Sequence, residues 1–149
     1  WNYFQSVETD ENEEFITKWQ AFTKNPERVS NDPMEATYIG FNMWVNAVTE
    51  AGTTDVDAVE QAMIGQETPN LTGGIAVMNK NHHLSKPVLI GEIQDDGQFE
   101  VVWETDGVVA GDAWSDFLPG SKDLISDWTA PIKCGNYNTK TKTCSGQNY

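Results

Sequence analysis

The stretch DPMEATY at residues 32–38 decides how the middle of this 149-residue chain folds, because it carries the signals of a helix N-terminus. Asp32 can accept hydrogen bonds from the free backbone N–H groups of a first turn, where Pro33 needs no donor. Glu35 follows three residues after Asp32 and is the expected partner in a capping box. The sequence therefore predicts a helix that begins at Pro33, with Asp32 as its N-cap.

Hydrophobic spacing extends this helix to about Ala51, where Gly52 provides a stop signal. A buried stripe is expected on one face, made of Tyr38, Phe41, Val45 and Val48 and widened by Met34 and Trp44.

Two further helices are predicted on either side. The first runs from Asp10 to about Lys24, with Glu13 as capping partner, and the third runs from after Thr54 to near Gly65. The inward residues are expected to be Phe15, Ile16, Trp19 and Phe22 in the first, and Val56, Val59 and Met63 in the third.

The pattern changes after residue 65. Residues 75–78 form a short apolar run, and residues 88–93 and 99–103 flank the turn sequence QDDG, which predicts a β-hairpin. Residues 1–7 have the composition of a strand, and residues 107–149 are typical of an irregular tail with one helical turn near 121–128. The class is α/β: three helices, a hairpin and a tail, with too few strands for a complete sheet. We therefore expect the C-terminal portion of a larger α/β protein.

Composition excludes several classes of partner. Lys and Arg total 9 against 23 Asp and Glu, a formal charge of −14. Nucleic acids and anionic lipids both need clustered cations, and the chain has no basic run. No apolar run approaches the roughly 20 residues of a membrane helix, so we expect no direct membrane insertion.

The two cysteines, Cys134 and Cys144, enclose a polar loop near the C-terminus. A disulfide would tie this tail down and would indicate an oxidising compartment. Zinc is the alternative, but it would need two further ligands, and the only histidines are the adjacent pair His82 and His83. The pair itself is more typical of local hydrogen bonding than of a metal site.

No catalytic motif is present, and we expect neither an enzyme nor a cofactor nor a metal site. The candidate ligand-binding residues are Asp32, Met34, Glu35 and Tyr38. Each carboxylate has several lone pairs and can serve a helix cap and a ligand rich in N–H donors together. Met34 and Tyr38 can wall a small pocket, although capping and core packing alone would also explain all four.

Three stretches, NDPMEATYIGF at 31–41, PNLTGG at 69–74 and NHHLSKPVLIGEI at 81–93, resemble the urea-binding proteins of bacterial ABC-type importers. The similarity continues through GDAWSDF at 111–117 to CGNYN at 134–138. These proteins belong to the type I periplasmic family that also binds branched-chain amino acids and short-chain amides.

The resemblance implies the C-terminal portion of a two-lobed receptor that closes on urea or a short-chain amide. Residues 1–87 would associate mainly with lobe I and residues 88–149 with lobe II. It also implies an ABC permease in the inner membrane as partner and a periplasmic location. The alternative is an amide-sensing regulatory protein of the same fold, since such sensors share the Asn-His-x-Leu-Ser pattern.

Overall fold

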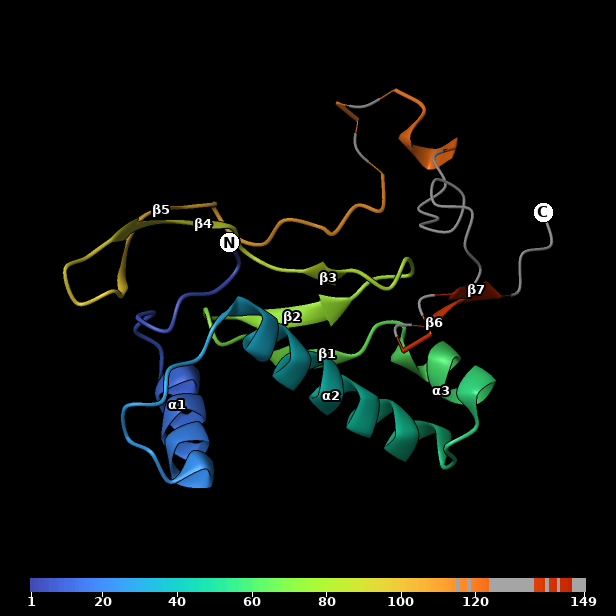
Figure 1. Cartoon of the computed structure of the whole chain (residues 1–149), viewed down its shortest axis with the longest axis horizontal. Helices are drawn as coiled ribbons and strands as arrows, with labels where there is room; N and C mark the ends of the chain where they lie inside the picture. The colour runs from blue at the N-terminus through green and yellow to red at the C-terminus, as the bar shows by residue number, and fades with distance from the viewer. Residues whose placement is uncertain (115, 118, 124–135, 139, 142, 146–149) are drawn as a thin grey trace. The chain divides into compact units, whose positions relative to one another are not determined.

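The computed structural model describes residues 1–114, 116–117, 119–123, 136–138, 140–141 and 143–145 (Figure 1). The chain divides into two compact units, Trp1–Ala113 and Trp114–Tyr149. All three predicted helices lie in the first unit: α1 (Asp10–Thr23), α2 (Asp32–Ala51) and α3 (Val56–Met63). The predicted helix positions are confirmed to within two residues at each end.

The N-caps of α1 and α2 lie one residue earlier than predicted. Thr9 accepts a hydrogen bond from the backbone N–H of Asn12, and Asn31 accepts one from that of Met34. Thr9 and Asn31 are themselves good caps, and both have the extended backbone that a cap requires. Asp32 is therefore in the first turn rather than at the cap, and the capping boxes predicted for Glu13 and Glu35 are wrong.

A three-stranded antiparallel sheet follows the helices, with the order β1-β2-β3. Its strands are β1 (Glu67–Pro69), β2 (Ile75–Met78) and β3 (Leu84–Ser85), and β2 coincides with the short apolar run noted at 75–78. Gly73 and Gly74 lie in the turn between β1 and β2, both at positive φ, a conformation that glycine adopts without strain.

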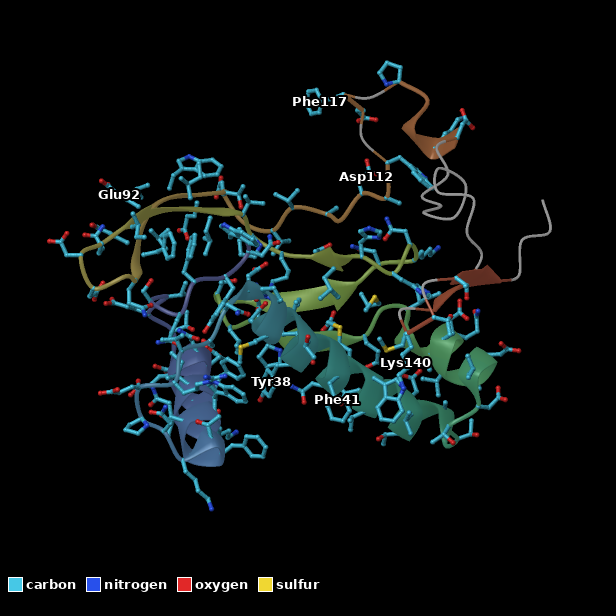
Figure 2. The ribbon with its side chains drawn as sticks, viewed as in Figure 1. Tyr38, Phe41, Glu92, Asp112, Phe117 and Lys140 are labelled. Atoms are coloured by element: carbon cyan, nitrogen blue, oxygen red, sulfur yellow. The ribbon has the colours of Figure 1, made fainter. Side chains whose placement is uncertain are left out.

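Helix α2 packs on this sheet in Figure 1, through a core cluster of Ile39, Met43, Ala76 and Met78. The buried row of α2 consists of Glu35, Ile39, Met43 and Ala47, at four-residue spacing. The predicted stripe is wrong: Tyr38, Phe41, Trp44 and Val45 are all exposed, Phe41 by 60% (Figure 2). Three short strands cover only one row of the helix, so the neighbouring aromatic row stays outside that core.

In the other two helices, too, some residues that were predicted to face inward are exposed. In α1, Phe15 is buried in a second cluster with Tyr3 and Leu71, whereas Phe22 is 81% exposed. In α3, Val59 is buried and Val56 is 75% exposed. Phe22 and Val56 are therefore corrections to the predicted inward faces.

The predicted hairpin is confirmed as β4 (Leu89–Ile93) paired with β5 (Phe99–Glu104). Residues 1–7, by contrast, do not form a strand, and that prediction is wrong. Only Trp1 pairs in the manner of a strand, because it exchanges two backbone hydrogen bonds with Leu89, of 3.0 and 2.7 Å.

Gly91 of β4 lies directly against two aromatic rings. A Cβ atom there would approach ring atoms of Phe4 to 2.8 Å and the Cβ of Phe99 to 3.1 Å. Those two rings stack on each other with centroids 4.7 Å apart. The absence of a side chain at Gly91 thus makes room for the Phe4–Phe99 stack.

Replacing Gly91 by alanine should therefore destabilise the protein by about 1–3 kcal/mol, because the stacked rings must move. Gly40→Ala is the matched control: it lies inside α2 with open space around it, and alanine should stabilise a helix interior by up to about 1 kcal/mol. Thermal unfolding followed by calorimetry should show a lower Tm for the first variant and an equal or higher Tm for the second. Equal changes of Tm in the two variants would contradict the close packing of Gly91 against Phe4 and Phe99.

The second unit contains a 3-10 turn, η1 (Ser121–Asp123), and a short hairpin of β6 (Asn136–Asn138) and β7 (Thr143–Ser145). The turn begins where a helical turn was predicted, and residues 124–128 lie outside the described part of the chain. The hairpin was not predicted. Cys134 also lies outside the described residues, so its disulfide with Cys144 stays a prediction. Among the described residues, no helix has the length and apolar character needed to cross a membrane.

Candidate functional site

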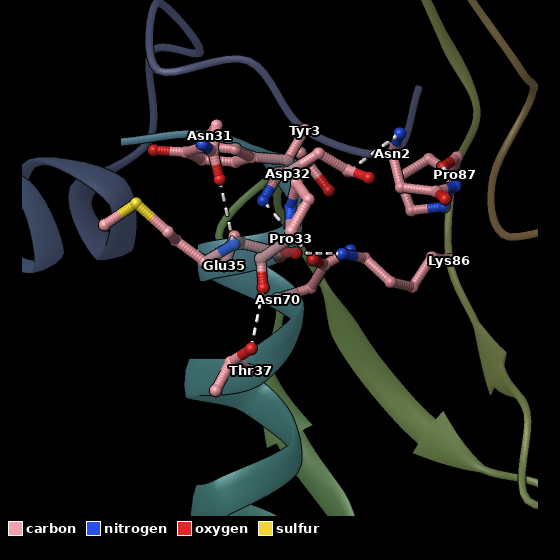
Figure 3. A network of polar contacts seen from close by, with 12 residues as sticks. Asn2, Tyr3, Asn31, Asp32, Pro33, Glu35, Thr37, Asn70, Lys86 and Pro87 are labelled. Carbon is pink, nitrogen blue, oxygen red and sulfur yellow. Dashed lines mark hydrogen bonds and ion pairs between the residues drawn. The ribbon is translucent and has the colours of Figure 1, made fainter. Parts of the chain in front are cut away.

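The first turn of α2 lies in a closed ring of polar contacts that joins three segments distant in sequence (Figure 3). The backbone N–H of Asn2 donates to Oδ1 of Asp32 at 3.2 Å, and the side-chain amide of Asn2 donates to the carbonyl of Pro87 at 2.7 Å. Lys86, the neighbour of Pro87, closes the ring through an ion pair with Glu35. Residues 1–2, 32–35 and 86–87 are thereby held together.

The Glu35–Lys86 ion pair is buried. The Glu35 side chain is fully buried and that of Lys86 is 8% exposed, and Nζ of Lys86 donates to Oε2 of Glu35. Lys86 is also fixed by its backbone, which forms an isolated antiparallel bridge with Val109. A charge buried this deeply requires a partner, so each residue needs the other.

The pKa of the Glu35 carboxyl is raised above its usual value, chiefly because burial penalises the charged form. The hydrogen bond and the positive charge of Lys86 oppose this rise, and the negative charge of Asp32 adds to it. The net direction shows that the ammonium offsets only part of the cost of burying the carboxylate.

Two polar atoms near the ion pair have no hydrogen-bond partner among the described residues. These are Oε1 of Glu35 and Nδ2 of Asn70, and both residues are fully buried. Figure 3 shows Asn70 close to Glu35. One atom is an acceptor and the other a donor.

Tyr3 anchors the segment that leads into this ring. Its hydroxyl hydrogen-bonds with Asn12 and with Ser30, each at 2.8 Å. Burial raises the pKa of Tyr3 to about 12, and the charge of Glu35 adds to the rise, while the bond with Ser30 lowers it. Tyr3 is therefore a neutral, fixed support.

An open groove of about 430 Å³ lies beside the start of α2, and we call it the Asp32 groove. The residues that line it include Trp1, Phe4, Val29, Asp32, Gln98 and Phe99. Among the described residues that line it, Asp32 has the only charged side chain. The groove thus combines largely apolar and aromatic walls with one carboxylate.

The four predicted site residues do not converge on one place. Asp32 lines the groove, whereas Glu35 is buried in its pair with Lys86. Tyr38 packs against Phe15 of α1, with ring centroids 4.8 Å apart, and Met34 is partly buried. Asp32 and Glu35 are brought together through the ring, and Tyr38 points to a different neighbour. Binding of a ligand by any of the four stays a prediction.

The sequence interpretation missed three residues of the ring, Asn2, Lys86 and Pro87. Lys86 offered a signal, because it is a lone cation two residues before the apolar run that begins at Val88. Nothing in the sequence pairs it with Glu35, which is 51 residues away.

Comparison with known proteins gives two findings. A limonene hydroxylase from Geobacillus stearothermophilus is 33% identical over 107 residues, which are 70% of this chain and 19% of that protein. The chain therefore spans about a fifth of the length of this relative. Residues 1–120 match the family model of the periplasmic binding protein domain. That match covers most of the chain, and the mixed α/β structure fits part of such a two-lobed fold. The chain belongs to the periplasmic binding protein domain family.

Proposed function

We propose that this chain is part of an extracytoplasmic solute-binding protein that captures urea or a short-chain amide for an ABC importer. Family membership supports the solute-binding role in general. The resemblance of residues 31–41, 69–74 and 81–93 to urea-binding proteins supports the specific ligand. In the proposal, the protein presents its ligand to a permease in the inner membrane and performs no catalytic step.

The observation that carries the proposal is the position of Asp32 in the groove. Its Oδ1 accepts one hydrogen bond, from Asn2, and a carboxylate has lone pairs for further donors. Urea and amides present N–H groups to such an acceptor. The ring of contacts holds Asp32 in place, which reduces the ordering cost of binding.

Glu35 has a different role in the proposal from the one predicted. Its buried carboxylate fixes the first turn of α2 to Lys86, so it positions Asp32 rather than lining the groove. We further propose that residues 1–87 associate mainly with one lobe of the receptor and residues 88–149 with the other. The ring would then lie where the two parts are joined, because it includes Pro87.

The proposal predicts that the Asp32→Ala variant binds acetamide or urea about 10-fold or more weakly than the unchanged protein. Loss of one hydrogen bond to a charged acceptor costs about 1.5–3 kcal/mol, and 1.4 kcal/mol is a factor of ten. Isothermal titration calorimetry measures the Kd directly. Asp57→Ala is the matched control, since Asp57 is an exposed carboxylate in the first turn of α3 and should leave the Kd unchanged. Equal affinities for the unchanged protein and Asp32→Ala would overturn the assignment of the groove.

Two assays test for enzymatic activity. Incubation with urea followed by ammonia detection tests hydrolysis. Incubation with limonene, oxygen and a reductant, followed by product analysis, tests the reaction that the relative's name describes. A binding protein should give neither product. Turnover in either assay would contradict the proposed function.

A further inference from the structure

We propose that an aromatic surface shared by α1 and α2 binds a second copy of this chain and so forms a weak, two-fold symmetric dimer. We call this surface the aromatic face, and its residues are Phe15, Trp19 and Phe22 of α1 and Tyr38, Phe41 and Trp44 of α2. The inference concerns no ligand, so it goes beyond the proposed function and does not depend on it.

The six rings form a continuous chain across the two helices. Phe15 joins the helices, because its ring contacts that of Tyr38 with centroids 4.8 Å apart. Further along α2, the rings of Phe41 and Trp44 stack with centroids 5.7 Å apart. Tyr38 and Phe41 project from the same side of α2 (Figure 2). In α1 the chain continues through a second stacked pair, with centroids 6.1 Å apart.

Much of the aromatic face is open to solvent. Phe22 and Phe41 are 81% and 60% exposed, and Trp44 and Tyr38 are 42% and 36% exposed. Since an aromatic side chain can bury roughly 150–250 Å², the open part amounts to about 450 Å². Soluble monomers rarely expose a contiguous apolar patch larger than a few hundred Å². Two such faces together would bury about 900 Å², which is the size of a weak protein–protein interface.

The spacing of the apolar residues on α2 is suited to contact with another helix. Tyr38, Phe41, Val45 and Val48 follow one another at intervals of three, four and three residues. This is the spacing of the contact seam between paired helices. At 3.6 residues per turn, this row lies on the side of α2 that faces away from the buried row beginning at Glu35. One side of α2 thus packs on the sheet, and the other presents a row that a second helix can cover.

The charge distribution favours a second copy of the chain as the occupant. With a net charge of −14, two copies repel each other over most of their surfaces. Residues 36–49 of α2, however, carry no charged side chain. In α1 the only charged residue after Phe15 is Lys18, which pairs with Glu14 at 2.6 Å. A basic partner would gain more from the carboxylates of α3 and the β4–β5 hairpin, whereas two copies avoid repulsion only at an uncharged face.

Self-complementarity makes a two-fold arrangement the simplest one. In an isologous contact the same patch meets itself, so any charge at its centre would face a like charge of the partner. The aromatic face has only neutral side chains, and α2 of one copy can therefore pack against α2 of its partner. Phe41 lies in the middle of the row and is expected near the two-fold axis.

Sedimentation velocity on the purified chain tests the inference. Between about 1 and 200 µM, the mass should rise from that of one chain toward that of two, as expected for an interface of this size. Raising the NaCl concentration from about 0.05 to 0.5 M should favour the dimer, because salt screens the repulsion between the two acidic copies.

Three variants locate the contact. Phe41→Glu places like charges at the centre of the proposed interface and should raise the Kd of the dimer about 10-fold or more. Phe22→Glu tests the α1 part of the face and keeps the inference testable if the first variant does not fold. Ile93→Glu is the matched control, since Ile93 is 67% exposed on β4 and the substitution should leave the Kd unchanged. Thermal unfolding checks that each variant is folded.

Three outcomes would overturn the inference. One is a chain that keeps the mass of a monomer at every concentration and salt level, which would leave the aromatic face to another part of a longer receptor. The second is the formation of assemblies larger than a dimer, and the third is dimerisation of both Phe41→Glu and Phe22→Glu as strong as that of the unchanged chain. The ligand titrations with Asp32→Ala test the proposed function separately, so either proposal can fail without the other.

Discussion

Replacing Lys86 by methionine is expected to destabilise the protein by about 3–5 kcal/mol, the usual cost of breaking a buried ion pair. Methionine fills a similar volume, so the loss reports on the charge left behind on Glu35, which is fully buried. Calorimetry should show a fall in Tm of roughly 6–20 °C. Heat is the preferred denaturant, because urea and guanidinium both resemble the proposed ligands.

The double variant Glu35→Gln/Lys86→Met is the matched control, because it removes both charges. It should be more stable than Lys86→Met alone, since no unpaired charge remains in the interior. A double variant that is as unstable as the sum of its single variants would mean that the two charges do not interact.

The effect of Lys86→Met should also depend on pH. Without the ammonium, nothing opposes the rise that burial causes in the pKa of Glu35. A carboxyl whose pKa is higher in the folded state than in the unfolded state contributes stability that is fully present below the unfolded pKa. That contribution is lost as the pH rises through the folded pKa. The stability of Lys86→Met should therefore approach that of the unchanged protein at acidic pH and fall further below it as the pH rises. A deficit that is constant across this range would contradict the assigned burial of Glu35.

The second large effect is expected at Met43, which is fully buried between α2 and the sheet. Met43→Ala should cost about 2–5 kcal/mol, because it removes buried apolar atoms and leaves a cavity. Phe41→Ala is the matched control on the same helix. Phe41 is 60% exposed and its ring contacts that of Trp44, so its loss should cost less than about 1 kcal/mol.

Differential scanning calorimetry on both variants distinguishes the observed core from the one that the sequence suggested. A larger fall in Tm for Phe41→Ala than for Met43→Ala would support the predicted aromatic stripe and contradict the packing seen here.

Local signals explain why the helices and the main hairpin were predictable. Gly52 ends α2 with positive φ, and the turn at 94–97 joins β4 to β5 as its composition indicates. The caps were misplaced by one residue, because Asn31 and Asp32 are both suitable caps and only the backbone conformation distinguishes them. Which of two adjacent candidate residues becomes the N-cap depends on the direction from which the chain enters the helix.

The buried face of α2 was not predictable, because the helix has two candidate apolar rows. One contains Ile39 and Met43, and the other contains larger residues such as Tyr38 and Phe41. Hydrophobicity alone favours the second row. The sheet is three short strands wide, and the smaller side chains of the first row allow α2 to lie close against it.

The site was predictable only in part. Asp32 and Glu35 were identified from local chemistry, and the structure links them through Asn2 and Lys86. The partners could not be inferred, since contacts across 30 and 51 residues depend on the tertiary fold. Tyr38 was assigned to the same site from its place in the stretch, but its side chain turns toward α1.

The long span between Glu35 and Lys86 has a consequence for the order of events during synthesis. A ribosome adds about 5–20 residues per second, so a delay of about 3–10 s separates the emergence of the two residues. Until Lys86 has left the exit tunnel, the carboxylate of Glu35 must remain hydrated, and α2 cannot seat its first turn. The first turn of α2 therefore reaches its packed position only after residue 86 is available, so the N-terminal end of this helix is among the last parts of the unit to settle.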